Sequence, residues 1–304
     1  MNRKVFIKSG LAVFGLTVLA ELVLRYYGLQ NPPLYISSPQ FEYILAPHQD
    51  LRYFGKRIFT NGFSQRSPTL RKGSIRILKV GDSIINGGNP TDHDELASSI
   101  LSDSLSASTK MDVQVLNISA GSWGPDNVFA YLEEFGSFEA ISMVMVFSSH
   151  DLHDIKGPGN IVGNVVGYPD KNPPFALYNA VERYVWKDLF TSKDDLSKLQ
   201  AANSVLDTFT ENPGFEQLIG FAREHKIQLI AYLHPTLLEL ERKAYDSNGK
   251  RILEIWKENN LEVMMGIDFM EANFYRDDIH LNADGQKRLA ELLFDPIKNT
   301  ISQN

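Results

Sequence analysis

The feature that most limits how this chain can fold is a short apolar run over residues 75–80, which ends in the turn Gly81-Asp82-Ser83. Its pattern predicts a largely buried strand, because strands of a parallel sheet are covered on both faces and need not alternate strictly. In open α/β sheets, ligands bind at the carboxyl ends of the strands. Ser83 is therefore predicted to lie where a nucleophile can reach a ligand, and the alternative is a turn serine that caps the next helix.

The remainder of the chain alternates between strand and helix patterns. Further strands are predicted over residues 113–117, 141–147, 228–232 and 263–265, and helices over residues 95–105, 127–135 and 283–294. The last helix follows a cap at Asn282 and is predicted to stop before Pro296. This alternation predicts crossover connections and a parallel sheet with helices on both faces.

The amino terminus carries an apolar run over residues 10–20, which Arg3, Lys4 and Lys8 precede, within a wider apolar segment over residues 5–24. The segment is long enough to cross about 30 Å of hydrocarbon as a helix. The preceding cations predict a cytoplasmic amino end and an exported body. An uncleaved anchor is favoured because apolar residues continue past Glu21, and a signal peptide cut after Ala20 is the alternative.

These patterns divide the chain into three parts. Residues 1–27 form a cytoplasmic tip and transmembrane anchor (or signal peptide), residues 28–72 an extracytoplasmic connecting segment, and residues 73–304 the α/β domain. A stretch rich in Gly and Pro, at about residues 155–199, is predicted to be an insertion after the third strand. Loops of this length in compact domains are often binding loops or lids.

Composition excludes several classes of function. The 304 residues are 43% hydrophobic and 22% charged, which is typical of a globular protein. The net charge of -7 argues against a nucleic-acid partner. The absence of cysteine excludes a thiol nucleophile, thiolate metal ligands and disulfides.

Polar residues follow the first three predicted strands and recur near the carboxyl terminus. After Ser83 come the loop 117–124, which contains Gly121, and the sequence Ser148-Ser149-His150-Asp151. Near the carboxyl terminus, Asp277 precedes His280 by three residues. A carboxylate at that spacing can accept the Nδ1 proton of the imidazole and leave Nε2 free to take a serine proton. The alternative is a helix-entry histidine that bonds only to its neighbours.

Four of these segments together resemble the sequence blocks I, II, III and V of the SGNH, or GDSL, hydrolase family. They are Gly81-Asp82-Ser83-Ile84, the glycine loop at 121, His150-Asp151 and Asp277-x-x-His280, and the resemblance covers roughly residues 74–300. It implies a three-layer α/β/α sandwich around a five-stranded, flavodoxin-like parallel sheet, and an enzyme that cleaves or transfers acyl groups from esters. It also implies that Ser83 is the nucleophile, His280 the base and Asp277 the residue that orients it. Asp278 is the rival carboxylate, but the family spacing selects Asp277.

The resemblance further implies an oxyanion hole formed by the backbone N–H groups of Ser83 and Gly121, with Ser122 as the alternative to Gly121, and by the side chain of His150. His150 occupies the position where the family normally has asparagine. A neutral imidazole can donate one hydrogen bond, and losing such a donor outright typically costs about 10²–10³ in kcat. No cofactor and no metal are expected, although the imidazoles and carboxylates of residues 150–154 could share an ion.

The predicted function is hydrolysis of O-acetyl esters on an exported or envelope polysaccharide, with an acylated carbohydrate or another ester as substrate. Two alternatives remain. One is a polysaccharide O-acetyltransferase that uses the same triad and a membrane protein as acyl donor. The other is a non-catalytic module of an envelope-assembly complex, which His150 favours. The predicted location is a bacterial inner membrane, crossed once, with the α/β domain in the periplasm; secretion after signal cleavage is the alternative.

Overall fold

The computed structural model describes residues 3–157, 161–186 and 210–303. Its centre is a five-stranded sheet made of β5 (Ile75–Gly81), β6 (Val113–Ser119), β7 (Ser142–Ser148), β8 (Gln228–His234) and β9 (Val263–Met265). The strand order is β6-β5-β7-β8-β9, and every neighbouring pair is parallel. Because β5 lies between β6 and β7, the chain order reverses beside it, and ligands bind at such a point in open α/β sheets.

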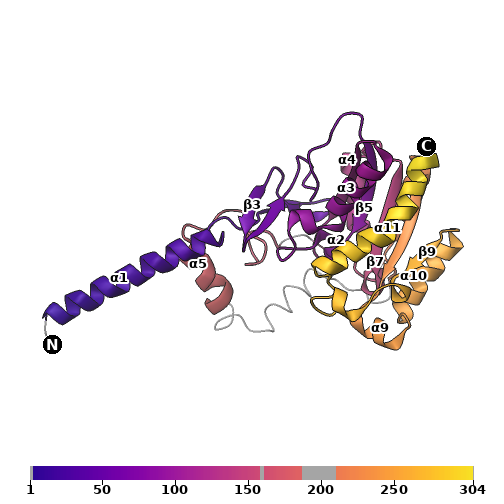
Figure 1. Cartoon of the computed structure of the whole chain (residues 1–304). Coiled ribbons are helices and arrows are strands. Elements are labelled where there is room, and N and C mark those ends of the chain that lie inside the picture. The colour runs from indigo at the N-terminus through magenta and orange to yellow at the C-terminus, as the bar shows by residue number, and fades with distance from the viewer. Residues whose placement is uncertain (1–2, 158–160, 187–209, 304) are drawn as a thin grey trace.

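Helices cover both faces of this sheet. One hydrophobic cluster joins the sheet to α4 (Pro125–Phe135), α8 (Gly214–Glu224) and α10 (Ser247–Glu258). A second cluster, on the other face, joins it to α3 (Ala97–Thr109) and α11 (Ala283–Gln303). The short helices α2 (Ser83–Asn86) and α9 (Leu237–Arg242) complete this part of the chain (Figure 1). The predicted three-layer sandwich with a flavodoxin-like sheet is confirmed.

The predicted end of the last helix was wrong. Asn282 caps α11 as expected, since its Oδ1 accepts a hydrogen bond from the Gly285 N–H at 2.9 Å. However, α11 runs through Pro296 to Gln303. A proline removes one helical hydrogen bond, but the apolar stripe continues beyond it, and Ile297 is fully buried in the same cluster as the first part of α11. Burial of this face therefore outweighs the lost bond.

Two antiparallel hairpins precede the sheet. They are formed by β1 (Tyr35–Ser38) with β2 (Glu42–Leu45), and by β3 (Asp50–Tyr53) with β4 (Lys56–Phe59). Phe41 and Tyr43 pack into the same cluster as α4, and the Trp123 indole donates a hydrogen bond to the Tyr43 carbonyl at 2.9 Å. The first hairpin is thus fastened to the loop that follows β6.

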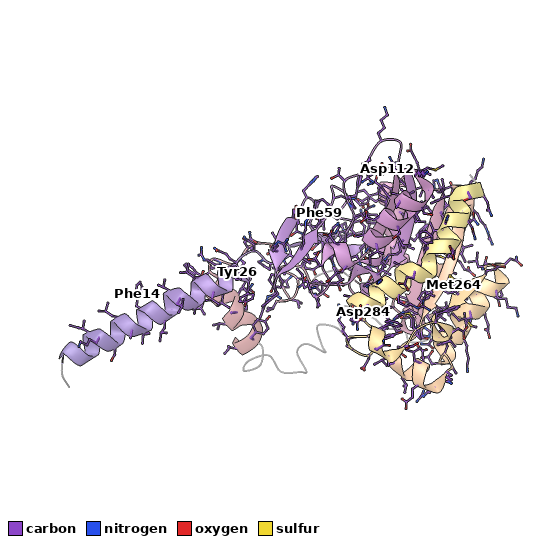
Figure 2. All side chains as sticks on the ribbon, in the orientation of Figure 1. Phe14, Tyr26, Phe59, Asp112, Met264 and Asp284 are labelled. Atoms are coloured by element: carbon purple, nitrogen blue, oxygen red, sulfur yellow. The ribbon has the colours of Figure 1, made fainter. Side chains whose placement is uncertain are left out.

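Helix α1 (Arg3–Tyr26) projects away from the remainder of the protein (Figure 1). Figure 2 shows the side chains of Phe14 and Tyr26 along it, and both are largely exposed. The segment Ile7–Tyr26 has a mean hydropathy of 1.8, and it is long and apolar enough to cross a membrane. A signal sequence has the same properties.

Part of the predicted insertion packs against the base of α1. The Glu21 carboxylate accepts hydrogen bonds from the backbone N–H groups of Ala176, at 3.0 Å, and Leu177, at 2.8 Å. These residues open α5 (Ala176–Val181), which leads into a π-helical turn (Glu182–Trp186). Asn179 adds a hydrogen bond to the Leu29 carbonyl at 2.6 Å. The insertion therefore holds the end of the apolar helix.

Another part of the insertion reaches the sheet edge. The Tyr168 ring packs edge-on against those of Tyr35 and Tyr43, with centroids 5.0 Å apart in each case. The Tyr43 hydroxyl in turn donates a hydrogen bond to the Gly121 carbonyl. Residues 158–160 and 187–199 of the predicted insertion lie outside the described residues.

Candidate active site

Ser83 is the first residue of α2 and follows directly after β5 and Asp82. The Asp82 side chain caps α2 by accepting a hydrogen bond from the Ile84 N–H at 2.9 Å. Gly81 is required by packing, because a Cβ atom there would lie 2.3 Å from the Val146 carbonyl oxygen of β7. Gly81 and Asp82 thus each have a local structural reason, and the turn leaves the Ser83 hydroxyl at the carboxyl edge of the sheet.

The structure brings Ser83, His280 and Asp277 together. His280 Nε2 lies 2.9 Å from Ser83 Oγ, although the two residues are 197 positions apart in sequence. On the other side of the ring, His280 Nδ1 lies 2.9 Å from Asp277 Oδ1 and 3.0 Å from Oδ2. It is thus the carboxylate of Asp277, the residue that the spacing favoured over Asp278, that contacts the imidazole.

Backbone donors hold Asp277 in its place and in its ionised form. Its Oδ1 accepts hydrogen bonds from the N–H groups of His280, at 2.8 Å, and Ile279, at 3.1 Å. Burial alone would raise the pKa of Asp277, but these two donors and the His280 ring outweigh it and hold the pKa below its usual value. The carboxylate is therefore charged at neutral pH and suited to accept the Nδ1 proton of His280.

A buried histidine steadies the loop that carries His280. His234, at the end of β8, is fully buried, and its Nε2 lies 2.9 Å from the Ile279 carbonyl oxygen. Its ring also stacks on Tyr275, with centroids 5.3 Å apart. Burial lowers the pKa of His234 to about 4, so its ring is neutral and can donate one proton to that carbonyl.

Arg66 is a supporting residue that the sequence analysis missed. Its side chain is buried, and its guanidinium donates hydrogen bonds to three backbone carbonyls of the loop after α2, those of Asn86 (2.6 Å), Gly88 (2.8 Å) and Thr91 (3.1 Å). Burial lowers the pKa of Arg66 to about 10. No sequence motif marks this arginine, because its partners are backbone carbonyls 20 to 25 positions away.

We expect Arg66→Lys to destabilise the protein by about 2–4 kcal/mol, because an ammonium group cannot reproduce the fork that reaches several carbonyls. The free energy of unfolding of the full chain in mild detergent measures this change. Arg57→Lys is the matched control, since Arg57 forms a surface ion pair with Asp50. Equal effects of the two substitutions would contradict the role given to Arg66.

A glutamine of α11 also fixes the position of α2. The Gln286 Nε2 donates to the Ile84 carbonyl at 2.8 Å, and its Oε1 accepts from the Ala97 N–H at 3.0 Å. Arg276, next to Asp277, donates to the Gly87 carbonyl at 3.0 Å. These contacts join the two halves of the site, which come from opposite ends of the sequence.

The three predicted oxyanion-hole residues lie just after the carboxyl ends of adjacent strands. Ser83 follows β5, Gly121 follows β6 and His150 follows β7, so all three are at one edge of the sheet. Ser122, the alternative to Gly121, adopts a left-handed conformation with a φ of 53°. Their role in stabilising an oxyanion stays a prediction.

The surroundings of His150 differ from those expected of a simple neutral donor. Its Nδ1 lies 2.6 Å from Ser148 Oγ. Its Nε2 lies 3.4 Å from Asp82 Oδ2 and 3.6 Å from Asp151 Oδ1. The negative charge of Asp151, aided by that of Asp82, raises the pKa of His150 to about 10, and burial raises the pKa of Asp151. Without another cation present, the ring is therefore expected to be an imidazolium.

His153, the other histidine in residues 150–154, contacts a different part of the chain. His153 Nδ1 lies 3.0 Å from the Thr210 carbonyl oxygen. The residues that do approach one another are Asp82, His150 and Asp151, which we call the Asp82–His150–Asp151 cluster. The cluster therefore joins two of the predicted sequence blocks rather than the contiguous run.

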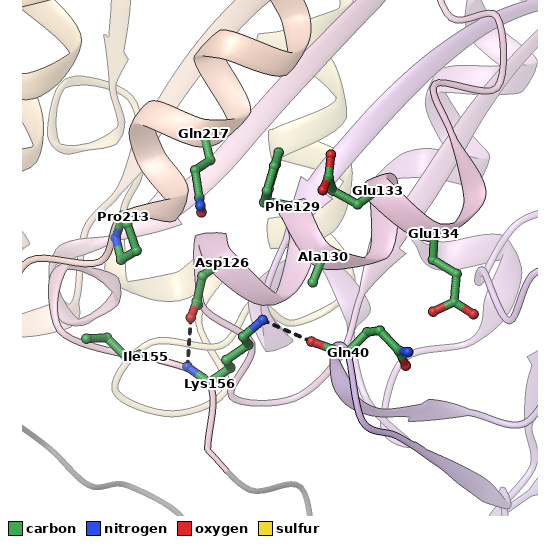
Figure 3. Close-up of a pocket in the computed structure, with 10 residues that line it drawn as sticks. All are labelled: Gln40, Asp126, Phe129, Ala130, Glu133, Glu134, Ile155, Lys156, Pro213 and Gln217. Carbon is green, nitrogen blue, oxygen red and sulfur yellow. Dashed lines mark hydrogen bonds between the residues drawn. The ribbon is translucent and has the colours of Figure 1, made fainter.

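A separate pocket of about 690 Å³ lies beside α4 (Figure 3). Lys156 is one of the residues that line it. Its Nζ donates a hydrogen bond to the Gln40 carbonyl at 3.1 Å, and its backbone N–H donates one to the Asp126 carboxylate at 2.9 Å. Ser83, Asp277 and His280 are not among the ten residues that line it. The pocket is therefore distinct from the site at the sheet edge.

Solved structures to which this chain is similar include three enzymes. A lipase/acylhydrolase from Enterococcus faecalis has a TM-score of 0.43 and 14% identity, with 74% of this chain and 96% of that chain covered. A psychrotrophic esterase from Pseudoalteromonas sp. has a TM-score of 0.44 and 13% identity, with 75% of this chain and 98% of that chain covered. A mutant of an acetyl-xylooligosaccharide esterase from a Geobacillus species has a TM-score of 0.43 and 16% identity, with 75% of this chain and 96% of that chain covered. All three are esterases or acylhydrolases.

At these identities the similarity concerns the fold. No family model matches the sequence, and neither does any curated protein.

Proposed function

We propose that the chain is a serine acyl-ester hydrolase of the SGNH type, with Ser83, His280 and Asp277 as its catalytic triad. The observation that carries this proposal is the 2.9 Å distance between His280 Nε2 and Ser83 Oγ. In the proposed reaction, Ser83 Oγ attacks the ester carbonyl while His280 takes its proton, and Asp277 stabilises the imidazolium that forms. His280 then protonates the departing alcohol, which leaves an acyl-enzyme that water resolves.

The oxyanion of the tetrahedral intermediate would be bound by donors at the same edge of the sheet. The backbone N–H groups of Ser83 and Gly121 are the proposed donors, together with the His150 side chain. Because both ring nitrogens of His150 face protein groups, this residue would contribute, as long as no metal ion is bound to it, as a positive charge held by Asp82 and Asp151 rather than as a neutral donor.

O-Acetyl groups on an exported or envelope polysaccharide are the substrate that we propose. The support is the apolar helix α1 and the cations Arg3, Lys4 and Lys8 at its amino end, which favour a chain anchored in a bacterial inner membrane with its α/β domain in the periplasm. A sugar hydroxyl in place of water would make the same triad an acetyltransferase with a membrane acyl donor. Product partitioning between water and an added acceptor oligosaccharide distinguishes the two.

A fluorophosphonate that reacts with activated serines tests the proposed triad. We expect the intact chain to gain one adduct, located on the peptide that contains Ser83, because only a serine beside a general base is nucleophilic enough to react at neutral pH. His280→Ala should prevent the adduct, while Ser247→Ala, an exposed serine of α10, should not. A folded chain that stays unmodified at Ser83 would contradict the proposal and favour the non-catalytic alternative.

A further inference from the structure

The Asp82–His150–Asp151 cluster has three ligand atoms that face one another. Asp82 Oδ2 and Asp151 Oδ1 both face His150 Nε2, and each of the three residues offers a ligand atom that lies within 4.8 Å of the other two. Both aspartate side chains are fully buried. Neither of these two carboxylate oxygens has a hydrogen-bond partner in the part of the chain that the structure describes. A buried carboxylate oxygen without a hydrogen bond is costly, and the positive partner near these two is the His150 ring, whose Nε2 lies 3.4 and 3.6 Å away.

The spacing of the three atoms suits a metal ion better than a proton. A charge-assisted N–H···O bond is typically about 2.7–2.9 Å long, whereas His150 Nε2 is 3.4 Å from Asp82 Oδ2 and 3.6 Å from Asp151 Oδ1. Ligand atoms at about 2.0–2.2 Å from a tetrahedral Zn²⁺ ion are about 3.3–3.6 Å from one another. The two separations measured from His150 Nε2 match edges of such a tetrahedron.

The other polar atoms of these three side chains are held by hydrogen bonds to neighbouring groups, as is usual for residues that coordinate a metal ion. Ser148 Oγ lies 2.6 Å from His150 Nδ1 and 3.2 Å from Asp151 Oδ2, which also accepts the Ser148 N–H at 2.6 Å. Asp82 Oδ1 accepts the Ile84 N–H at 2.9 Å. Such contacts fix the orientation of metal ligands and leave the opposite atoms free to coordinate.

We propose that Asp82, His150 and Asp151 form a binding site for one divalent transition-metal ion, of which Zn²⁺ is the best match. One imidazole and two carboxylates suit Zn²⁺, and three protein ligands leave the fourth position open to water or to another oxygen ligand. The His150 side chain is 45% exposed, so an ion can enter from solvent. The site stands on these residues alone and does not depend on esterase activity.

The test is titration of the metal-stripped full chain, in mild detergent, with Zn²⁺ under calorimetric detection. We expect saturation at one ion per chain, and Asp151→Asn should weaken binding at least 100-fold. His225→Gln, which changes an exposed histidine at the end of α8, should leave the affinity unchanged. Absence of saturable binding, or equal affinity in Asp151→Asn, would overturn the proposal and leave an imidazolium between two carboxylates.

A second variant keeps the test decisive if Asp151→Asn does not fold. Ser148→Ala removes no ligand, but it removes the hydroxyl that orients His150 and Asp151, and we expect binding to weaken about 10- to 100-fold. Co²⁺ in place of Zn²⁺ should give the intense visible absorption of a four-coordinate site, and Ser148→Ala should alter that spectrum. A spectrum identical to that of hydrated Co²⁺ in the parent chain would refute the site.

Discussion

Ser83→Ala is expected to lower the rate of hydrolysis of an aryl acetate by at least about 10³-fold, because the acyl-enzyme can no longer form. The residual rate would come from binding and from the remaining donors at the sheet edge. The measurement is kcat of the purified full chain, with unchanged thermal unfolding as the check that the fold persists. Ser83 contacts the His280 ring through its hydroxyl, so this substitution removes one atom and leaves the backbone N–H in place.

Two further variants make this result specific. Ser247→Ala, on the surface of α10, should retain the parent rate. Ser83→Ala/His280→Ala should be little slower than Ser83→Ala alone, because residues that act as a unit are strongly non-additive. If Ser83→Ala keeps the parent rate, Ser83 has no place in the reaction. If the double variant shows the full product of two separate losses, the two residues do not act as one unit.

Lys79→Met is expected to stabilise the protein by about 4 kcal/mol at pH 7. Lys79 lies in the middle of β5, and its side chain is fully buried. Its ammonium nitrogen has no hydrogen-bond partner among the residues that the structure describes. Burial lowers the pKa of Lys79 from 10.5 to about 7, and each tenfold change in proton affinity corresponds to about 1.4 kcal/mol. Methionine has a similar length and no charge to desolvate.

The sign of the pH dependence follows from the same pKa values. Between pH 7 and pH 10.5 the unfolded chain holds the Lys79 proton more tightly than the folded chain, so the free energy of unfolding rises with pH. This group contributes a slope of up to about 1.4 kcal/mol per pH unit, which Lys79→Met should remove. Lys72→Met, at an exposed position, is the control. Parallel pH curves for the parent and Lys79→Met would contradict the lowered pKa.

The sheet and the contact between Asp277 and His280 were predictable because each rests on a local pattern. The apolar runs at 75–80 and 141–147 identify buried strands, and their carboxyl ends fall at one edge in any parallel sheet. Asp277 and His280 are three residues apart, so their mutual contact is a property of one short loop. That this loop lies close to Ser83, 197 positions away, was expected from the resemblance to the SGNH family and not from a local pattern.

Other features depend on contacts between distant segments and leave no local signature. Arg66 donates hydrogen bonds to backbone carbonyls, and every residue has one. The residue types in the sequence therefore do not indicate which groups Arg66 contacts. His150 and Asp151 are adjacent in sequence, so their proximity was evident. Asp82 lies near them because β5 pairs with β7, and the sequence does not show that pairing. The length of α11 was missed because the burial of Ile297 beyond Pro296 is a tertiary effect.

The hydrogen bonds between Glu21 and the start of α5 join the base of α1 to the insertion that follows β7. The same insertion touches Tyr43 through Tyr168, and the Tyr43 hydroxyl bonds to the Gly121 carbonyl. The insertion therefore contacts both the base of α1 and the loop beside Ser83. Should α1 cross a bilayer, these contacts would help to set the height of the sheet edge above the lipid surface.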